Sequence, residues 1–82
     1  MDHETVTKEL FEIYKEKNEG YGNSFVQTHN RLGIKASVGQ INHKMNRVIN
    51  QVNSDVDYDL VDDLKDLANY VIMLIMILEV EV

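Results

Sequence analysis

The sequence predicts an all-α protein, a small bundle of three long helices and one short helix that is completed by homo-oligomerisation. Three observations predict it. Apolar residues recur at spacings of three and four along most of the chain, which is the period of an amphipathic helix. No segment shows a strand pattern. A chain of 82 residues is long enough for only one domain, residues 1–82, and its core is thin. Because the chain contains no cysteine, no disulfide stabilises that core.

The first helix is expected to run from about Thr5 to Asn18. Its apolar residues follow a helical stripe: Val6, Leu10, Phe11, Ile13 and Tyr14. Residues 18–24 contain two Gly and two Asn and predict a loop that ends this helix. Ser24 is then placed to cap a short helix over residues 25–31, and Gly33 breaks the pattern again.

The second long helix is expected to begin at Ser37, a favourable N-cap, and to end near Val52. Its apolar residues are Val38, Ile41, Met45, Val48, Ile49 and Val52, and its polar side carries His43, Lys44, Asn46, Arg47 and Asn50. This spacing is that of a helix with one buried face. Residues 53–57 predict a turn.

The last helix is expected to begin at a cap provided by Asp55, Asp57 or Asp59 and to end near Val80. Up to Tyr70, an apolar stripe and an acidic stripe lie back to back. The apolar stripe contains Leu60, Leu64, Leu67, Val71, Ile75 and Leu78, and the acidic stripe contains Asp59, Asp62, Asp63 and Asp66 with Tyr70. Beyond Tyr70 the helix is apolar all round. We therefore expect residues 71–78 to be buried in a homo-oligomer, the alternative being that they pack beneath the first helix.

The composition argues against several function classes. The formal charge is −6, from 8 basic and 14 acidic residues, whereas duplex nucleic acid is bound through Lys and Arg. The apolar run from Tyr70 to Leu78 has 9 residues, and a membrane span needs about 20. The acidic start of the chain does not resemble a signal peptide. We expect a cytoplasmic protein that binds neither duplex nucleic acid nor a membrane.

Asp62, Asp63 and Asp66 are candidate ligands of Mg²⁺. Carboxylates one helical turn apart can share a hard divalent cation, which in turn can hold the phosphates of a nucleotide. The alternative is a solvated acidic face in the first turns of a helix, where the helix dipole favours Asp. His29 and His43 are too isolated in the sequence to predict a zinc site.

The chain resembles a known family in three strings that follow one another: Tyr21-Gly22-Asn23-Ser24-Phe25, Lys44-x-x-Arg47, and Asp62-x-Leu64-x-Asp66-Leu67-Ala68-Asn69-Tyr70. The family is the phage and bacterial nucleotide modification associated domain of the first type, a relative of the MazG-like all-α nucleotide pyrophosphohydrolases. The resemblance covers about residues 10–78. It implies a protein of a bacterium or a phage-infected host that binds a nucleotide or a nucleotide-derived small molecule.

In the enzymatic relatives, acidic motifs on two neighbouring helices bind Mg²⁺, which holds the triphosphate and activates water. The resemblance implies that Asp62 and Asp66 are catalytic and that they bind Mg²⁺ together with Asp63. The other acidic motif is absent here, since His43 stands where the suspected family commonly has Asp. The Glu that usually precedes the second motif is also missing. The resemblance therefore predicts nucleotide binding with reduced or lost catalysis.

The predicted nucleotide-binding residues are Tyr21, Asn23, Ser24, Phe25, Lys44, Arg47, Asn69 and Tyr70. If the second long helix is antiparallel to the last, Lys44 and Arg47 face the acidic stripe. They would then either bind phosphate oxygens or form salt bridges with Asp62 and Asp66.

The aromatic and amide residues also have two interpretations each. Tyr21 or Phe25 would stack on a base, or Gly22 serves only to turn the chain. Asn69 is a weak helix former, so we expect its side chain to make a specific hydrogen bond, to a ligand or to backbone in residues 21–25.

Three function classes remain open at this point. The first is a Mg²⁺-dependent pyrophosphohydrolase that cleaves a nucleoside triphosphate to monophosphate and pyrophosphate. The second is an anti-defence protein that sequesters a nucleotide without turnover. The third is an acidic helical inhibitor that binds a host protein and no small molecule.

Overall fold

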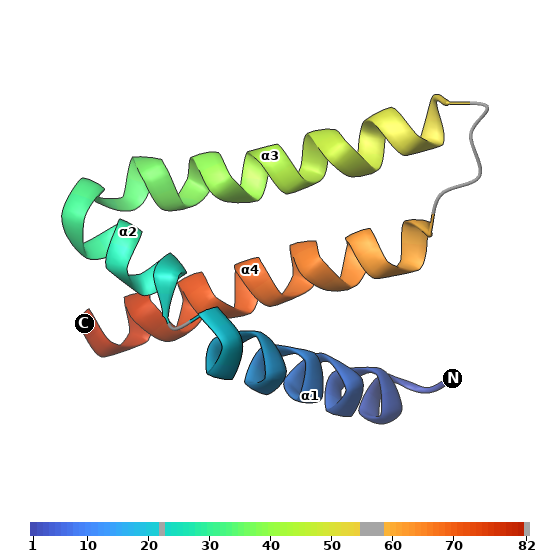
Figure 1. Cartoon of the computed structure of the whole chain (residues 1–82), viewed down its shortest axis with the longest axis horizontal. Helices are drawn as coiled ribbons and strands as arrows, with labels where there is room; N and C mark the ends of the chain where they lie inside the picture. The colour runs from blue at the N-terminus through green and yellow to red at the C-terminus, as the bar shows by residue number, and fades with distance from the viewer. Residues whose placement is uncertain (22, 55–58, 82) are drawn as a thin grey trace.

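The computed structural model describes residues 1–21, 23–54 and 59–81, and these residues form four α-helices and no strand (Figure 1). The helices are α1 (His3–Tyr21), α2 (Ser24–Leu32), α3 (Ile34–Val52) and α4 (Leu60–Glu81). The predicted all-α class and the short second helix are confirmed, whereas homo-oligomerisation stays a prediction. α3 and α4 form an antiparallel hairpin, and α4 lies between α3 and α1 (Figure 1).

The helix ends differ from the predicted ones by a few residues. Asp2 caps α1, because its carboxylate accepts a hydrogen bond from the backbone N–H of Thr5 at 2.9 Å. α1 continues to Tyr21, so the predicted end at Asn18 is wrong. At the start of α4, the carboxylate of Asp59 accepts the N–H of Asp62 at 3.3 Å. Asp59 is thus the predicted cap that the structure supports, and Asp55 and Asp57 lie outside the described residues.

The corner between α2 and α3 is a single residue, Gly33. Its φ of 87° lies in the left-handed region, which glycine adopts without the strain that a Cβ would cause. The chain can therefore reverse within one residue, and α3 begins at Ile34. The prediction that Ser37 is the N-cap of this helix is wrong. Ser37 lies within the helix, is fully buried, and is hydrogen-bonded to Nδ1 of His29 at 2.8 Å.

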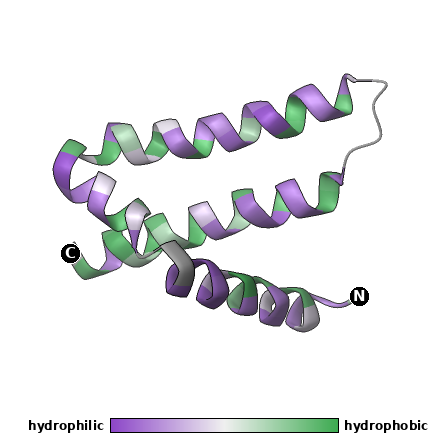
Figure 2. Cartoon of the chain, in the orientation of Figure 1, coloured by the Kyte–Doolittle hydropathy of each residue, from purple (hydrophilic) through white to green (hydrophobic). Residues whose placement is uncertain are grey.

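The core enclosed by this chain is small and half polar. Among the described residues, the buried side chains are Leu10, Phe25, Val48 and Ile77, together with the polar His29, Ser37, Asp63 and Asn69. Hydrophobic residues nevertheless recur along the whole of α3 and α4 (Figure 2). Many apolar side chains of these two helices are left partly uncovered by the rest of the described chain.

The predicted orientation of α4 is only partly right. Leu64, Val71 and Ile75 belong to the predicted packing stripe, yet each is exposed, while Asp63 and Asn69 are buried. The physical reason is that α1 and α3 both contact α4 through polar side chains, as the ion pairs described below show. None of the four described helices combines the length and apolar character that a membrane-spanning helix needs.

The end of α4 follows in part the alternative interpretation of residues 71–78. Met73, Met76 and Ile77 line an apolar groove of about 360 Å³, together with Tyr14 of α1 and Val26 of α2. On this side of the segment Ile77 is buried and Met73 half-buried, while Val71, Ile72, Ile75 and Met76 are exposed.

Candidate functional site

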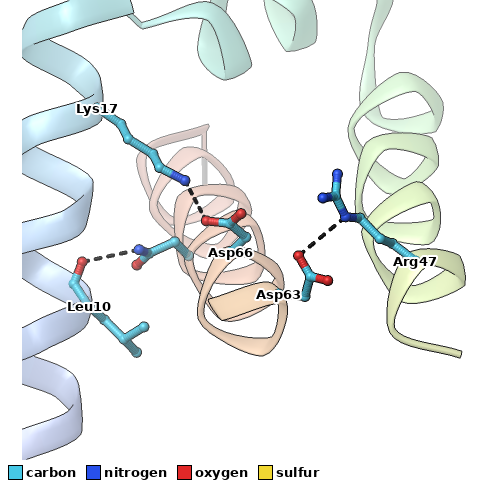
Figure 3. Close-up of polar contacts among 6 residues, drawn as sticks. Leu10, Lys17, Arg47, Asp63 and Asp66 are labelled. Carbon is cyan, nitrogen blue, oxygen red and sulfur yellow. Dashed lines mark hydrogen bonds and ion pairs between the residues drawn. The ribbon is translucent and has the colours of Figure 1, made fainter. Parts of the chain in front are cut away.

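The acidic stripe of α4 divides between its two neighbouring helices (Figure 3). Asp66 points toward α1, where its carboxylate forms an ion pair with the amine of Lys17. Asp63 points toward α3, where Oδ1 lies 3.2 Å from Nε of Arg47. A third ion pair, Lys65–Glu9 at 2.9 Å, also joins α4 to α1. The polar stripe thus holds the helices together.

Asp63 is the most buried of the three predicted metal ligands, with 8% of its surface exposed. Its second oxygen, Oδ2, is buried and has no hydrogen-bond partner in the part of the chain that the structure describes. Arg47 is the only side chain there that forms an ion pair with this carboxylate. The contact therefore compensates the charge of a largely buried carboxylate, while the Arg47 side chain is 60% exposed and water partly screens the pair.

Asp62 is exposed and lies next to Asp59. A hydrogen bond to Asp59 and the negative charge of that carboxylate raise the pKa of Asp62 above its ordinary value. The three predicted ligands therefore have separate surroundings: Asp62 lies beside another acid, and Asp63 and Asp66 each face a cation. Within residues 1–21, 23–54 and 59–81, no group of three His, Asp or Glu side chains is placed to hold a metal ion. A Mg²⁺ ion at this stripe would have to displace Lys17 and Arg47.

Lys44 and Arg47 lie on the side of α3 that faces α4, as predicted. Arg47 contacts Asp63 rather than Asp62 or Asp66. The amine of Lys44 lies 5.2 Å from the centre of the Tyr70 ring, a cation–π contact, and it forms no ion pair with a described residue. The predicted meeting of these helices is thus confirmed, with Asp63 and Tyr70 as the residues in contact.

A groove opens where α2, α3 and α4 meet, with a volume of about 380 Å³. It is lined by Thr28, Ala36, Gly39, Gln40, His43, Lys44 and Tyr70. No atom lies within 4 Å of the position that a Cβ would take at Gly39. The Nε2 atom of Gln40 is buried and has no acceptor among the described residues. The groove therefore offers hydrogen-bond donors, a cation and an aromatic ring.

Of the predicted 21–25 segment, the described residues 23–25 do not line this groove. Phe25 is buried, with its ring centre 5.2 Å from that of Tyr70 and the ring planes at 58°, so its faces are covered by the core. Asn23 and Ser24 are exposed at the start of α2, and Asn23 lines the apolar groove at the end of α4 instead. Gly22 and the side chain of Tyr21 lie outside the described residues.

Asn69 makes the specific hydrogen bond that its position in a helix predicted. Its Nδ2 donates to the backbone carbonyl of Leu10 at 3.1 Å, and both residues are buried. The partner is thus in α1 rather than in residues 21–25. This bond joins α1 to α4, so Asn69 acts in packing in this arrangement.

Sequence reasoning did not identify Thr28, Gln40 and the buried pair of His29 and Ser37. The signal for Gln40 was its position four residues before Lys44, which places both on one face of α3. The His29–Ser37 contact depends on the sharp corner at Gly33, and no periodic pattern indicates it.

Comparison with known proteins gives no match for this chain: no family model, no curated protein and no solved structure is similar to it.

Proposed function

We propose that the protein binds a nucleotide in the groove between α2, α3 and α4, with the phosphates at Lys44. The observation that carries this proposal is the position of Lys44. At the helix contacts described above, the other cations are paired with carboxylates, whereas Lys44 lies over the Tyr70 ring and has no described acidic partner. Its charge is therefore available to an anion that enters the groove.

Hydrogen-bond donors next to Lys44 suit a phosphate group. Gln40 precedes Lys44 by one helical turn, so the two side chains are neighbours on α3. The buried Nε2 of Gln40 lacks an acceptor among the described residues, and an unpaired buried donor costs free energy. A phosphate oxygen would supply that acceptor, while Lys44 compensates the charge. Thr28 lines the same groove and contributes a hydroxyl.

Tyr70 suits the base of the same ligand. In this structure Lys44 covers one face of the Tyr70 ring. When Lys44 moves to a phosphate, that face is free for a base to stack on, and such stacking accepts any base. When the ligand binds, stacking of the base on the Tyr70 ring thus replaces the contact of Lys44 with that ring.

The resemblance of the three strings supports a nucleotide as the anion. His43, which lines the groove, stands where the suspected family commonly has Asp, and this replacement removes a carboxylate that would repel phosphate. Asp63 and Asp66 are engaged by Arg47 and Lys17, so a Mg²⁺ ion would compete with two cations for them. We therefore favour binding without turnover, in a protein that sequesters a nucleotide, over pyrophosphate release.

The test is calorimetric titration of the protein with nucleoside tri- and monophosphates and cyclic nucleotides, with and without Mg²⁺, alongside an assay for pyrophosphate. We expect binding without pyrophosphate release. Lys44→Met should weaken binding by at least about tenfold, since it removes the unpaired cation. Lys35→Met removes the same charge from an exposed position on α3 outside the groove and should leave the affinity unchanged.

Other outcomes would contradict the proposal in distinct ways. Pyrophosphate release that Asp66→Asn abolishes would establish the hydrolase instead. Equal losses in the Lys44 and Lys35 variants would show that only overall charge matters. No binding of any nucleotide would leave the third class, an acidic helical protein that binds a protein partner.

A further inference from the structure

The hairpin of α3 and α4 carries an apolar surface that the rest of the chain leaves uncovered. Eleven large apolar side chains on these two helices are between 39% and 64% exposed, and all except Met76, which lines the apolar groove beside α1 and α2, belong to this surface. The residues of the surface are Ile34, Val38, Met45, Ile49 and Val52 on α3, and Val61, Leu64, Val71, Ile72 and Ile75 on α4. We call these ten residues the open face. None of them carries a charge.

The two helices present these residues on the same side of the hairpin. With about 100° per residue, the exposed apolar residues of α3 are centred roughly 135° around the axis from Lys44 and Arg47, which contact α4. The exposed apolar residues of α4 are centred at roughly the same angle, in the same direction of rotation, from Asp63 and Tyr70, which contact α3. Because the helices are antiparallel, equal rotations bring both stripes to one side. α1 contacts α4 through Lys65, Asp66 and Asn69, on the opposite side.

Most residues of the open face belong to two longer apolar series that have the spacing of helices that pack against other helices. On α3, apolar residues follow one another at positions 34, 38, 41, 45, 48 and 52, and on α4 at positions 61, 64, 68, 71, 75 and 78. The other members of these series are less exposed, and Val48 is buried. Both series alternate spacings of three and four. This heptad pattern lets side chains of one helix fit between those of another at a small crossing angle.

We infer that the open face binds a second copy of this chain, forming a two-fold dimer whose core is a bundle of two α3–α4 hairpins. The ten side chains expose on the order of 800 Å², which is what each partner contributes to a stable interface of standard size. Monomeric proteins seldom expose a continuous apolar patch this large. A second copy offers two heptad stripes of matching length and spacing, and four-helix bundles are completed in this way.

Charge does not prevent a second copy from binding. Two chains with a formal charge of −6 repel each other, and the repulsion is smallest when the surfaces that meet are uncharged. A membrane surface is a poorer occupant, because helices that lie on membranes carry Lys and Arg toward anionic lipids. This inference moves the interface from residues 71–78 to the whole hairpin. Met73 and Ile77 of that segment face α1 and α2 instead.

Sedimentation equilibrium of the full chain tests the inference without any nucleotide. We expect twice the mass of one chain at micromolar concentration. Ile49→Glu and Ile75→Glu should each raise the dissociation constant by at least about tenfold, because each would bury an unpaired charge. Phe11→Glu makes the same change at an exposed residue of α1 that is not part of the open face, and this variant should remain dimeric.

A second measurement covers the case in which a Glu variant does not fold. For a dimer, the melting temperature of the unmodified chain should rise with protein concentration, because association stabilises the folded state. A chain that stays monomeric up to millimolar concentration, or whose melting temperature is independent of concentration, would overturn the inference. Dissociation of Phe11→Glu to the same extent as the two face variants would do so as well.

Discussion

The two sides of the α3–α4 hairpin differ in the kind of side chain that they present. The contacts of α4 with α3 and with α1 are ion pairs, a cation–π contact and the hydrogen bond of Asn69. The side away from these contacts is the open face, which has no charge and no covering element in the described chain. The strongest hydrophobic pattern in the sequence thus lies where this chain does not pack on itself.

This difference separates two tasks. Apolar surface supplies most of the free energy of folding and association, and it does so without regard to direction. Polar contacts supply less net free energy but fix which side chains meet. In the proposed dimer, the open face would provide stability, while the polar side would position Lys44 and Tyr70 for a ligand.

Phe25 is the exception on the polar side, and truncating it should have the largest effect on stability. The ring is 4% exposed and packs against Tyr70 beside the groove. Phe25→Ala should lower the free energy of unfolding by about 3 to 4 kcal/mol, because it leaves a cavity as well as losing buried area. Chemical denaturation monitored by circular dichroism measures the change.

Phe11 provides the matched control for this substitution. It is 56% exposed on α1, so Phe11→Ala should change the free energy of unfolding by less than about 0.5 kcal/mol. A small effect of Phe25→Ala, similar to that of Phe11→Ala, would mean that the open face alone stabilises the fold and that the polar side contributes no core.

The sequence was sufficient to predict that the chain is helical, because spacings of three and four persist along α1, α3 and α4. It was not sufficient to predict how α4 is rotated. An apolar stripe such as Leu64, Val71 and Ile75 indicates that a face is buried, but it does not say whether the same chain or another one covers it. The open face is such a stripe, and the described part of this chain leaves it uncovered.

The candidate site shows the same limit at the level of single residues. The antiparallel hairpin that brings Lys44 and Arg47 to the acidic stripe followed from helix order and short connections. Which acid contacts Arg47 depends on a rotation of α4 by less than the angle between successive residues, and no sequence pattern specifies that rotation. In the structure this acid is Asp63. The unpaired Gln40 became visible only once α2 had been placed by the corner at Gly33.

Breaking the Arg47–Asp63 contact should have the second largest effect. Arg47→Met leaves the 8%-exposed Asp63 carboxylate without a cation, which should cost about 1 to 2 kcal/mol, since the exposed guanidinium is partly screened by water. Adding Asp63→Asn to Arg47→Met should restore most of the loss, because the buried charge is then absent. A double-mutant cycle in chemical denaturation gives the coupling.

The Lys17–Asp66 pair is the comparison for this cycle. The Lys17 side chain is 57% exposed, so Lys17→Met should cost at most about 1 kcal/mol, and the loss should shrink in high salt. Equal coupling energies in the two pairs would show that the burial of Asp63 has no energetic consequence, and would weaken the argument that Mg²⁺ must compete with a strong contact there.

The smallest predicted effect concerns pH, and it has opposite signs at two exposed acids. The hydrogen bond from the N–H of Thr5 lowers the pKa of Asp2, so the stability that Asp2 provides is present above its unfolded pKa and is lost as pH falls through the folded pKa. The neighbouring Asp59 raises the pKa of Asp62. The folded state therefore binds a proton at Asp62 more tightly than the unfolded state, and stability falls as pH rises through the folded pKa of Asp62.

Titration of the two carboxyl groups by NMR should give midpoints on either side of the ordinary Asp value. Asp59→Asn should bring only the midpoint of Asp62 back toward that value. Two midpoints at the ordinary Asp value would contradict both contacts. They would show that the N–H of Thr5 does not stabilise the Asp2 carboxylate and that Asp59 does not affect Asp62 at the start of α4.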